Sequence, residues 1–352
     1  MIWELLGGAA AAGLVSLIVC RVQMAAGPVD VPDAARKTHR GPTPTSGGIG
    51  IALGYTAGLV ALIEYGDAIG LTRQVASLAW LASVLSFIFL LIGFVDDNRA
   101  LGPRLKFLSF SLLSIAAAIT MGVVDELPLG PGVEWRLGLS LGLFGTALWA
   151  FTMVNAVNFM DGANGLAMGS MAIGLFALAA IAVVNGSNVA AALCFCAAGG
   201  IAGFLVWNFP NGKIFAGDAG ALFAGAVAAI ASLIVLARTG VSPFVPPILF
   251  FPILADALLT LAWRVKRRRK ILVGHQEHLY QIALRSGWSH RNISLVYWAA
   301  MAVCGLIGFA LAHRHEGAES WVALAILAVV SVGVSVAVRG FARARGLDQL
   351  DQ

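Results

Sequence analysis

Two adjacent aspartates, Asp96 and Asp97, follow a long apolar run and are candidates for metal chemistry. Neighbouring carboxylates repel each other, so both stay ionised only where a cation or good solvation supports them. A divalent metal bound to phosphate groups would supply that support, and the nearby bases Arg99, Arg104 and Lys106 would help to hold the anion. The alternative is a polar loop that merely ends a transmembrane helix.

A second polar segment spaces Asn155, Asn158 and Asp161 by three residues. If a helix extends through them, they lie along one drifting face. Amides beside a carboxylate suit a metal-bound diphosphate or the edge of a nucleobase. Gly162 and Gly165 follow, and glycine lets the backbone turn sharply toward a ligand. A polar helix end with glycine caps is the other interpretation, but asparagines in an apolar run are expensive to bury without partners.

A lone aspartate, Asp218, stands between Gly217 and Gly220 at the expected start of a helix. Aspartate is a common N-cap residue, which is the simplest explanation. The same residue could instead bind a metal while the exposed amides of the helix N-terminus hold an anion.

His275 and His278 are three residues apart, a spacing that occurs in zinc sites. No cysteine or third histidine lies nearby, and Glu277 is expected to point elsewhere on a helix, so hydrogen bonding to phosphate oxygens is favoured over zinc. A basic run, Lys266 to Lys270, precedes them and serves either as a membrane anchor or as a contact for anionic lipid or substrate. Asp256, well inside an apolar span, requires a hydrogen bond or an ion pair within the bundle.

The composition is that of a membrane protein. The chain has 352 residues, is 59% hydrophobic and 12% charged, and has a mean hydropathy of +0.87. A soluble protein of this length carries about twice that charged fraction. The four cysteines all lie in apolar runs and are expected to behave as small hydrophobic residues. We therefore expect an all-α polytopic membrane protein, with residues 1–352 forming one integral membrane domain.

The apolar runs predict a bundle of eleven transmembrane helices, because each span needs roughly 20 apolar residues. The long unbroken runs exclude barrel strands. The first run contains Glu4 and lacks a basic leader, so it is expected to be a retained helix and not a cleaved signal peptide. The expected spans are 2–22, 47–66, 75–95, 105–123, 138–157, 166–184, 189–207, 219–237, 244–264, 292–312 and 320–338.

The basic residues predict the orientation of this bundle. With the loops after the odd-numbered spans on one side, that side holds all but four of the 23 lysines and arginines, the exceptions being Arg73, Arg136, Arg238 and Arg314. The rich side is therefore expected to be cytoplasmic. All four polar segments fall on that side, although lysines and arginines alone decided the assignment. This predicts one shared active site at the inner face of the cytoplasmic (cell inner) membrane.

Four motifs, in this order, resemble those of the polyprenyl-phosphate N-acetylhexosamine-1-phosphate transferases, glycosyltransferase family 4. They are D-D-x-x-x-L, N-x-x-N-F-M-D-G-x-x-G-L, F-x-G-D-x-G and H-x-x-H-L-Y-Q. The Pro-Thr-Pro-Thr-Ser-Gly-Gly loop that begins at Pro42 is similar too, so the match covers about Arg36 to Arg291. Because the run of consecutive histidines typical of the peptidoglycan translocases is absent, the chain looks like the branch that starts O-antigen or related lipopolysaccharide and polysaccharide synthesis.

The resemblance implies a magnesium-dependent transfer of a sugar 1-phosphate from a UDP-sugar to undecaprenyl phosphate, with release of UMP. It implies catalytic roles for Asp96, Asp97, Asp161, His275 and His278, metal binding by Asp218 and Asp161, and substrate contacts from Asn158 and Asn164. The residue types add Asn155, Lys106, Arg40 and Lys37 as further expected substrate contacts. Many members carry aspartate at the position of Asn164, which in the family lies by the uracil. An amide can still pair with that edge.

Several alternatives stay open. The aspartates either attack first or only assist the lipid phosphate, and the peptidoglycan-type phospho-N-acetylmuramoyl-pentapeptide translocase is the second enzyme reading. A secondary transporter would hold its polar site near mid-membrane, and a CDP-alcohol phosphotransferase would need a denser aspartate motif. The candidate partners are undecaprenyl phosphate, a UDP-N-acetylhexosamine, membrane lipids and a second copy of the chain, with no nucleic acid.

Overall fold

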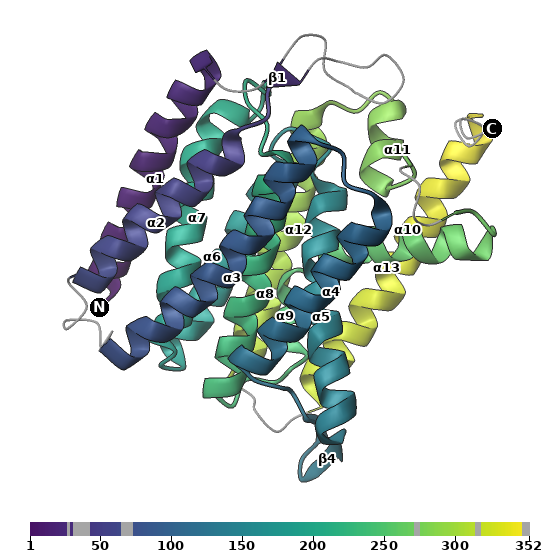
Figure 1. The fold of residues 1–352 in the computed structure, drawn as a ribbon. Helices are drawn as coiled ribbons and strands as arrows, with labels where there is room; N and C mark the ends of the chain where they lie inside the picture. Colours follow the sequence, from purple (N-terminus) through teal and green to yellow (C-terminus); the bar gives the residue numbers. More distant parts are fainter. Residues whose placement is uncertain (27–28, 31–42, 65–72, 271–274, 314–317, 347–352) are drawn as a thin grey trace.

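The computed structural model is a bundle of long helices, most of which run side by side (Figure 1). It describes residues 1–26, 29–30, 43–64, 73–270, 275–313 and 318–346. The elements in these residues are α1 (Ile2–Ala26), β1 (Val29–Asp30), β2 (Thr43–Pro44), α2 (Gly47–Glu64), α3 (Arg73–Asn98), α4 (Pro103–Met121), β3 (Glu126–Gly130), β4 (Val133–Arg136), α5 (Gly138–Met160), α6 (Leu166–Val184), α7 (Asn188–Asn208), α8 (Gly217–Arg238), α9 (Val245–Leu249), α10 (Phe251–Lys266), α11 (Leu279–Arg285), α12 (His290–Leu311) and α13 (Glu319–Ala344). The strands form two small antiparallel pairs, β1 with β2 and β3 with β4.

The expected all-α polytopic class is confirmed, with one correction to the spans. Ten helices in the described part are long and apolar enough to cross a membrane, namely α1 to α8, α12 and α13. The ninth of the eleven expected spans, 244–264, is broken into α9 and α10 at Phe250. Pro252 explains the break, because its ring would clash with the carbonyl of Ile248 in a continuous helix and it has no N–H to donate.

The broken pair still carries the chain back across the bundle. The two chain ends lie at opposite ends of the helices in Figure 1, and α11 stands at the end where the C-terminus lies. From α9, low in the view, α10 leads toward α11, high in the view. The α9–α10 segment thus crosses the bundle where the sequence predicts the ninth span. Helix α10 itself does not run parallel to the neighbouring helices.

Helix α8 forms the centre of the bundle. In its most apolar 18-residue window, 94% of the residues are buried inside the protein. Glycine and alanine dominate its sequence, and small residues let helix backbones approach closely in a membrane protein. At Gly93 of α3, for example, an added Cβ would lie 2.6 Å from the backbone N of Ala219. The first turn of α8, which carries Asp218, is thus held between neighbouring helices.

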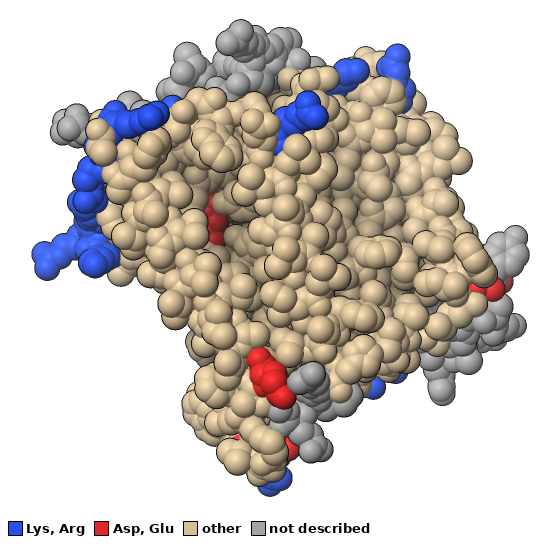
Figure 2. Space-filling view, turned by 180° about the vertical axis from the view of Figure 1, so that it is seen from behind, with Lys and Arg blue, Asp and Glu red and all other residues tan. Residues whose placement is uncertain are grey.

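The polar segments meet at one end of the bundle. Hydrogen bonds join the last turn of α3 to the first turn of α8, and α5 to both α8 and α11. Lysine and arginine side chains gather mainly toward this same end in the view from behind, with some at the other end, whereas acidic side chains are seen in a hollow and toward the other end (Figure 2). This arrangement accords with the prediction of one shared site, and the cytoplasmic orientation stays a prediction.

Cysteine labelling should test the orientation. With a cysteine at Gln276, a membrane-impermeant thiol reagent is expected to label the protein only after the cytoplasmic side is opened. The matched control is Glu134→Cys in β4, which should label from outside. The native cysteines add little background, because Cys20, Cys194, Cys196 and Cys304 are buried. Labelling of the Gln276 variant from outside only would overturn the shared cytoplasmic site.

Candidate active site

Asp97, in the last turn of α3, caps the N-terminus of α8. Its two carboxylate oxygens accept the backbone N–H of Asp218 at 2.9 Å and the N–H of Ala219 at 3.1 Å. The negative charge also suits the positive end of the helix macrodipole. Gly217 has φ +70°, and an added Cβ there would stand 2.6 Å from the Asp97 carboxylate. The N-cap role considered for Asp218 is therefore wrong, since Asp218 lies inside the first turn and Asp97 caps it from 121 positions away.

Asp96 and Asp218 share a lysine. Lys106, in the first turn of α4, pairs with Asp96, and its ammonium lies 3.4 Å from an oxygen of Asp218. Asp96 also accepts the backbone N–H of Leu101 at 2.7 Å, and Asp218 accepts the side-chain amide of Asn158 at 2.9 Å. Side chains from α3, α4, α5 and α8 thus converge, and Lys106 partly neutralises two of the carboxylates.

Asp161 ends α5 beside these groups and experiences their negative charge. Burial, and then the charges of Asp218 and Asp97, raise the pKa of Asp161 to about 7. A bound cation would oppose that rise, because it favours the ionised carboxylate. Among the described residues, no three Asp, Glu, His or Cys side chains form a ready metal cluster. A magnesium ion in such a place takes one or two carboxylates and completes its oxygen ligands with water and substrate phosphate.

The glycine-rich end of the Pro-Thr-Pro-Thr-Ser-Gly-Gly loop packs beside this cluster. Phe215 donates its N–H to the carbonyl of Pro44 at 2.8 Å, and Gly47 donates back to the carbonyl of Phe215 at 2.9 Å. Gly48 donates to the carbonyl of Ala216 at 3.0 Å. Backbone pairing therefore fixes the segment just before α8 against the start of α2. Lys37 and Arg40, predicted to contact substrate, lie outside the described residues.

His275 and His278 lie ahead of α11, and their rings stack. The ring centroids are 5.0 Å apart with an angle of 29° between the planes. The helix expected around Glu277 does not include this segment, because α11 begins only at Leu279. The ring Nδ1 of His275 accepts the backbone N–H of Glu277 at 3.4 Å, which leaves Nε2 as its donor when neutral. Burial, followed by the charges of His278 and Arg264, lowers the pKa of His275 to about 4.

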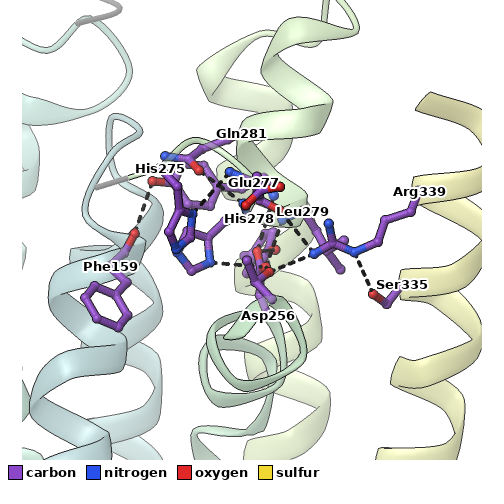
Figure 3. Close-up of polar contacts among 12 residues, drawn as sticks. Phe159, Asp256, His275, Glu277, His278, Leu279, Gln281, Ser335 and Arg339 are labelled. Carbon is purple, nitrogen blue, oxygen red and sulfur yellow. Dashed lines mark hydrogen bonds and ion pairs between the residues drawn. The ribbon is translucent and has the colours of Figure 1, made fainter. Parts of the chain in front are cut away.

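His278 occupies the N-cap position of α11 and is only 3% exposed. Its backbone N–H donates to the side chain of Gln281 at 3.1 Å, and its Nδ1 lies 3.6 Å from a carboxylate oxygen of Asp256 (Figure 3). Asp256 also accepts the backbone N–H groups of Leu279 at 2.8 Å and Tyr280 at 3.3 Å. The hydroxyls of Tyr297 and Thr260 donate to the same carboxylate at 2.6 and 3.2 Å, so the partners that the sequence required for Asp256 come from the start of α11, from α12 and from its own helix.

Tyr280 connects this histidine segment to the aspartates. Its hydroxyl donates to the carbonyl of Phe159 at 3.2 Å, and Phe159 lies between Asn158 and Asp161 in the chain. The ring of Phe159 also lies 6.0 Å from that of His278, centroid to centroid. The second and fourth polar segments are thus in direct contact.

The two remaining amides predicted to contact substrate are engaged by the protein itself. Asn155 donates to the carbonyl of Phe151 at 2.7 Å within α5, and Asn164 donates to the carbonyl of Pro210 at 3.0 Å. Asn164 thereby ties the turn after α5 to the loop between α7 and α8. Their carbonyl oxygens keep acceptor capacity, and their substrate contacts stay predictions.

Three residues that the motif reading did not assign hold the histidine segment. Glu277 is buried and pairs with both Arg264 and Arg269, and does not lie on a helix face as expected. The two arginines lie in or beside the basic run at the end of α10, for which the sequence predicts either a membrane anchor or a contact for anionic lipid or substrate. In the sequence, the feature that indicates this structural role is Glu277, a single acidic residue that follows the basic run.

Comparisons with known proteins agree with this geometry. The sequence model of glycosyl transferase family 4 matches residues 79–236. A probable undecaprenyl-phosphate N-acetylglucosaminyl 1-phosphate transferase of Bacillus subtilis is 29% identical over 92% of this chain and 87% of its own length. A decaprenyl-phosphate N-acetylglucosaminephosphotransferase of Mycobacterium leprae is also 29% identical, over 92% of this chain and 86% of its own length. A phospho-N-acetylmuramoyl-pentapeptide-transferase of Moorella thermoacetica is 30% identical over 76% of this chain and 84% of its own length.

The matched part contains three of the four motif segments described above, and the whole-length relatives extend over the fourth. A relative at this identity, aligned over most of both chains, establishes common descent and a common fold. The chain therefore belongs to glycosyl transferase family 4, the polyprenyl-phosphate N-acetylhexosamine-1-phosphate transferases, and is an enzyme of the phosphoglycosyl transferase type.

Proposed function

We propose that the protein transfers an N-acetylhexosamine 1-phosphate from a UDP-sugar to undecaprenyl phosphate and releases UMP. The observation that carries the proposal is the convergence of four aspartates, Asn158 and Lys106 where the polar segments meet. Family membership supplies the general reaction, the transfer of a sugar phosphate to a polyprenyl phosphate. The N-acetylglucosamine relatives cover 92% of the chain and the pentapeptide relative 76%, which favours the simple amino-sugar donor.

Magnesium fits the donor set of this cluster. Asp218 and Asp161 would hold it, because carboxylate oxygens are the ligands that Mg²⁺ prefers. Asp161 lies close enough to the other carboxylates for their charges to raise its pKa, and such an excess of negative charge attracts a cation. When bound, the ion would neutralise phosphate charge during the transfer.

The residues of the chain divide the remaining work between them. A phosphate oxygen of the lipid forms a bond to the phosphorus that carries the sugar, and the bond from that phosphorus to the UMP oxygen breaks with its electron pair. Lys106, already between Asp96 and Asp218, spreads the negative charge of the two substrates. Asp97 holds the first turn of α8, and so the position of Asp218, through its two backbone contacts.

His275 and His278 are proposed to donate to the diphosphate of the UDP-sugar. His275 is neutral at pH 7 and donates from Nε2, because its Nδ1 accepts from Glu277. His278 faces a carboxylate oxygen of Asp256 with Nδ1 at 3.6 Å, which leaves Nε2 as the ring atom for the phosphate.

Alanine at either histidine should separate catalysis from capping. We expect His278→Ala to lower kcat by about ten- to a hundredfold, the effect of losing a charge-assisted bond of roughly 1.5–3 kcal/mol, and His275→Ala to lower it less. Steady-state kinetics with saturating lipid phosphate, beside thermal unfolding in detergent, measure both effects. The matched control is His313→Ala, an exposed histidine after α12. If both variants unfold early but keep full kcat when folded, the histidines only cap the turn.

A second candidate reaction uses UDP-N-acetylmuramoyl-pentapeptide as the donor. The Moorella relative is named for that transfer and is 30% identical, which keeps this candidate in place. Its name also points to the cell wall, and none of the relatives reported above is named for O-antigen or lipopolysaccharide synthesis. O-antigen initiation is accordingly a narrower proposal, and it requires that the donor panel below gives product with a simple amino sugar.

The decisive experiment is a donor panel. Purified protein is incubated with undecaprenyl phosphate, magnesium and, in turn, UDP-N-acetylglucosamine, UDP-N-acetylgalactosamine and UDP-N-acetylmuramoyl-pentapeptide. Mass spectrometry of the lipid and release of UMP report the reaction. We expect a lipid diphosphate product with a simple amino sugar. Product with the pentapeptide donor alone would select the second candidate, and no lipid product with any donor would refute the proposal.

A further inference from the structure

The last helix, α13, contributes one buried charge to the histidine segment. Arg339 is only 5% exposed, whereas Arg343 and Arg345 beyond it are exposed. One Nη nitrogen of Arg339 donates to the hydroxyl of Thr260 at 2.9 Å and to the backbone carbonyl of Glu277 at 3.1 Å. Its Nε donates to the hydroxyl of Ser335 at 3.3 Å (Figure 3).

A plain membrane anchor does not explain this placement. A basic residue that only fixes orientation stays in water or in the lipid headgroups, whereas a buried guanidinium loses its hydration and must recover the loss through partners. Helix α13 buries few side chains, namely Ser320, Ser335, Arg339 and Ala342. Arg339 and its partner Ser335 are two of these four, so the polar contact is a main point of attachment for the helix.

Two routes lead from Arg339 to His278. The first is direct, because the carbonyl of Glu277 that accepts from Arg339 belongs to the residue just before His278. The second passes through Thr260, whose hydroxyl donates to Asp256 at 3.2 Å while it accepts from Arg339. Asp256 in turn faces Nδ1 of His278 and holds the start of α11. Both routes end at His278, the first at the backbone just before it and the second at its ring.

We propose that Arg339 is a positioning residue that holds the histidine segment in the orientation required for transfer. The inference rests on the proposed function for its effect on turnover, and on the contacts above for its effect on structure. Among the described residues, Glu277, Thr260 and Asp256 link Arg339 to the histidine segment by hydrogen bonds. A helix at the far end of the chain thus completes a site whose motifs all lie before it.

A double-mutant cycle tests the effect on turnover. Arg339→Gln is expected to lower kcat about tenfold or more, with the KM for the UDP-sugar changed less than about threefold. In a His278→Ala background the same replacement should cost less than about twofold, because the group that it positions is gone. Arg339→Lys should restore part of the loss. Losses that multiply independently in the double variant would show that Arg339 acts elsewhere.

Hydrogen exchange, read by mass spectrometry in detergent, tests the contact without any turnover. We expect Arg339→Gln to speed exchange in residues 275–286 and to leave α8 unchanged. Arg343→Gln is the matched control, because Arg343 also lies against the ring of Trp263 but is exposed. If Arg339→Gln fails to fold, Thr260→Val removes one route without stranding a charge and should speed the same segment. Unchanged exchange there overturns the inference, whereas a wild-type protein that releases no UMP refutes only the proposed function.

Discussion

Asp218→Ala is expected to abolish magnesium-dependent turnover and leave a folded protein in the membrane. Asp218 sits in the first turn of α8, where Asn158 and Lys106 orient its carboxylate and Asp97 holds its backbone. Loss of that oxygen donor removes half of the proposed metal site, and positioned charged groups of this kind are worth at least about a hundredfold each. Release of UMP across a magnesium titration, with undecaprenyl phosphate present, measures the loss.

The thermal stability of the Asp218→Ala variant should stay the same or increase, although its turnover is lost. Removing Asp218 takes away one of the negative charges that crowd Asp161, so the thermal midpoint of the variant should equal or exceed that of the wild type. Asp125→Ala is the matched control, since Asp125 is an exposed aspartate at the other end of the bundle, and it should keep full turnover. Binding of Mn²⁺, followed by electron paramagnetic resonance, reports the site independently of turnover. Near-normal turnover of the Asp218 variant would remove this residue from the metal site.

Much of the architecture is predictable because membranes restrict the choices. A chain of this hydropathy must form helices or a barrel, and runs of roughly 20 apolar residues decide between them. The break between α9 and α10 was also visible in the sequence as Pro246, Pro247 and Pro252. The apolar run around these prolines is long enough for one span, so its length alone predicts a single helix, whereas the missing N–H and the ring of proline break it.

The sequence predicts which residues form the candidate site. It does not predict the structural role of each residue. Asp97 and Asp218 both stood out as carboxylates at helix ends, yet only the fold reveals that one caps the helix of the other. The sequence predicts a helix around Glu277, whereas in the structure Asp256 and Gln281 build the helix start only after His278. Such contacts join distant parts of the chain, and no local pattern encodes them.

The structural roles of the basic residues are the hardest to predict from the sequence. Basic residues at helix ends satisfy the positive-inside rule wherever they lie, so Arg264, Arg269 and Arg339 gave no sign of a further role. In the structure all three contact Glu277, through its carboxylate or its backbone carbonyl. An acidic residue within a basic stretch is therefore worth treating as a centre of contacts in related membrane proteins.

The paired aspartates should lose activity for different reasons. Asp96→Asn and Asp97→Asn are each expected to lower turnover at least about a hundredfold. Asp97→Asn should also lower the stability by about 1–2 kcal/mol, because an amide presents one acceptor oxygen where two backbone N–H groups now bond, and it removes the charge at the start of α8. Asp96→Asn keeps an oxygen for the backbone N–H of Leu101 and gives up the charge that pairs with Lys106, which retains Asp218, so its thermal midpoint should stay near that of the wild type.

The comparison needs turnover and thermal unfolding measured on the same preparations, with Asn98→Ala as the control. Asn98 is the next residue in the chain, is exposed and bonds only its own helix through the carbonyl of Phe94, so both quantities should stay within a small factor of wild type. A drop in stability for Asp97→Asn but not for Asp96→Asn assigns the helix cap to Asp97 in solution. Equal stability of the two variants would show that α8 keeps its first turn without this carboxylate, and Asp97 would then belong with the groups that act on the substrate directly.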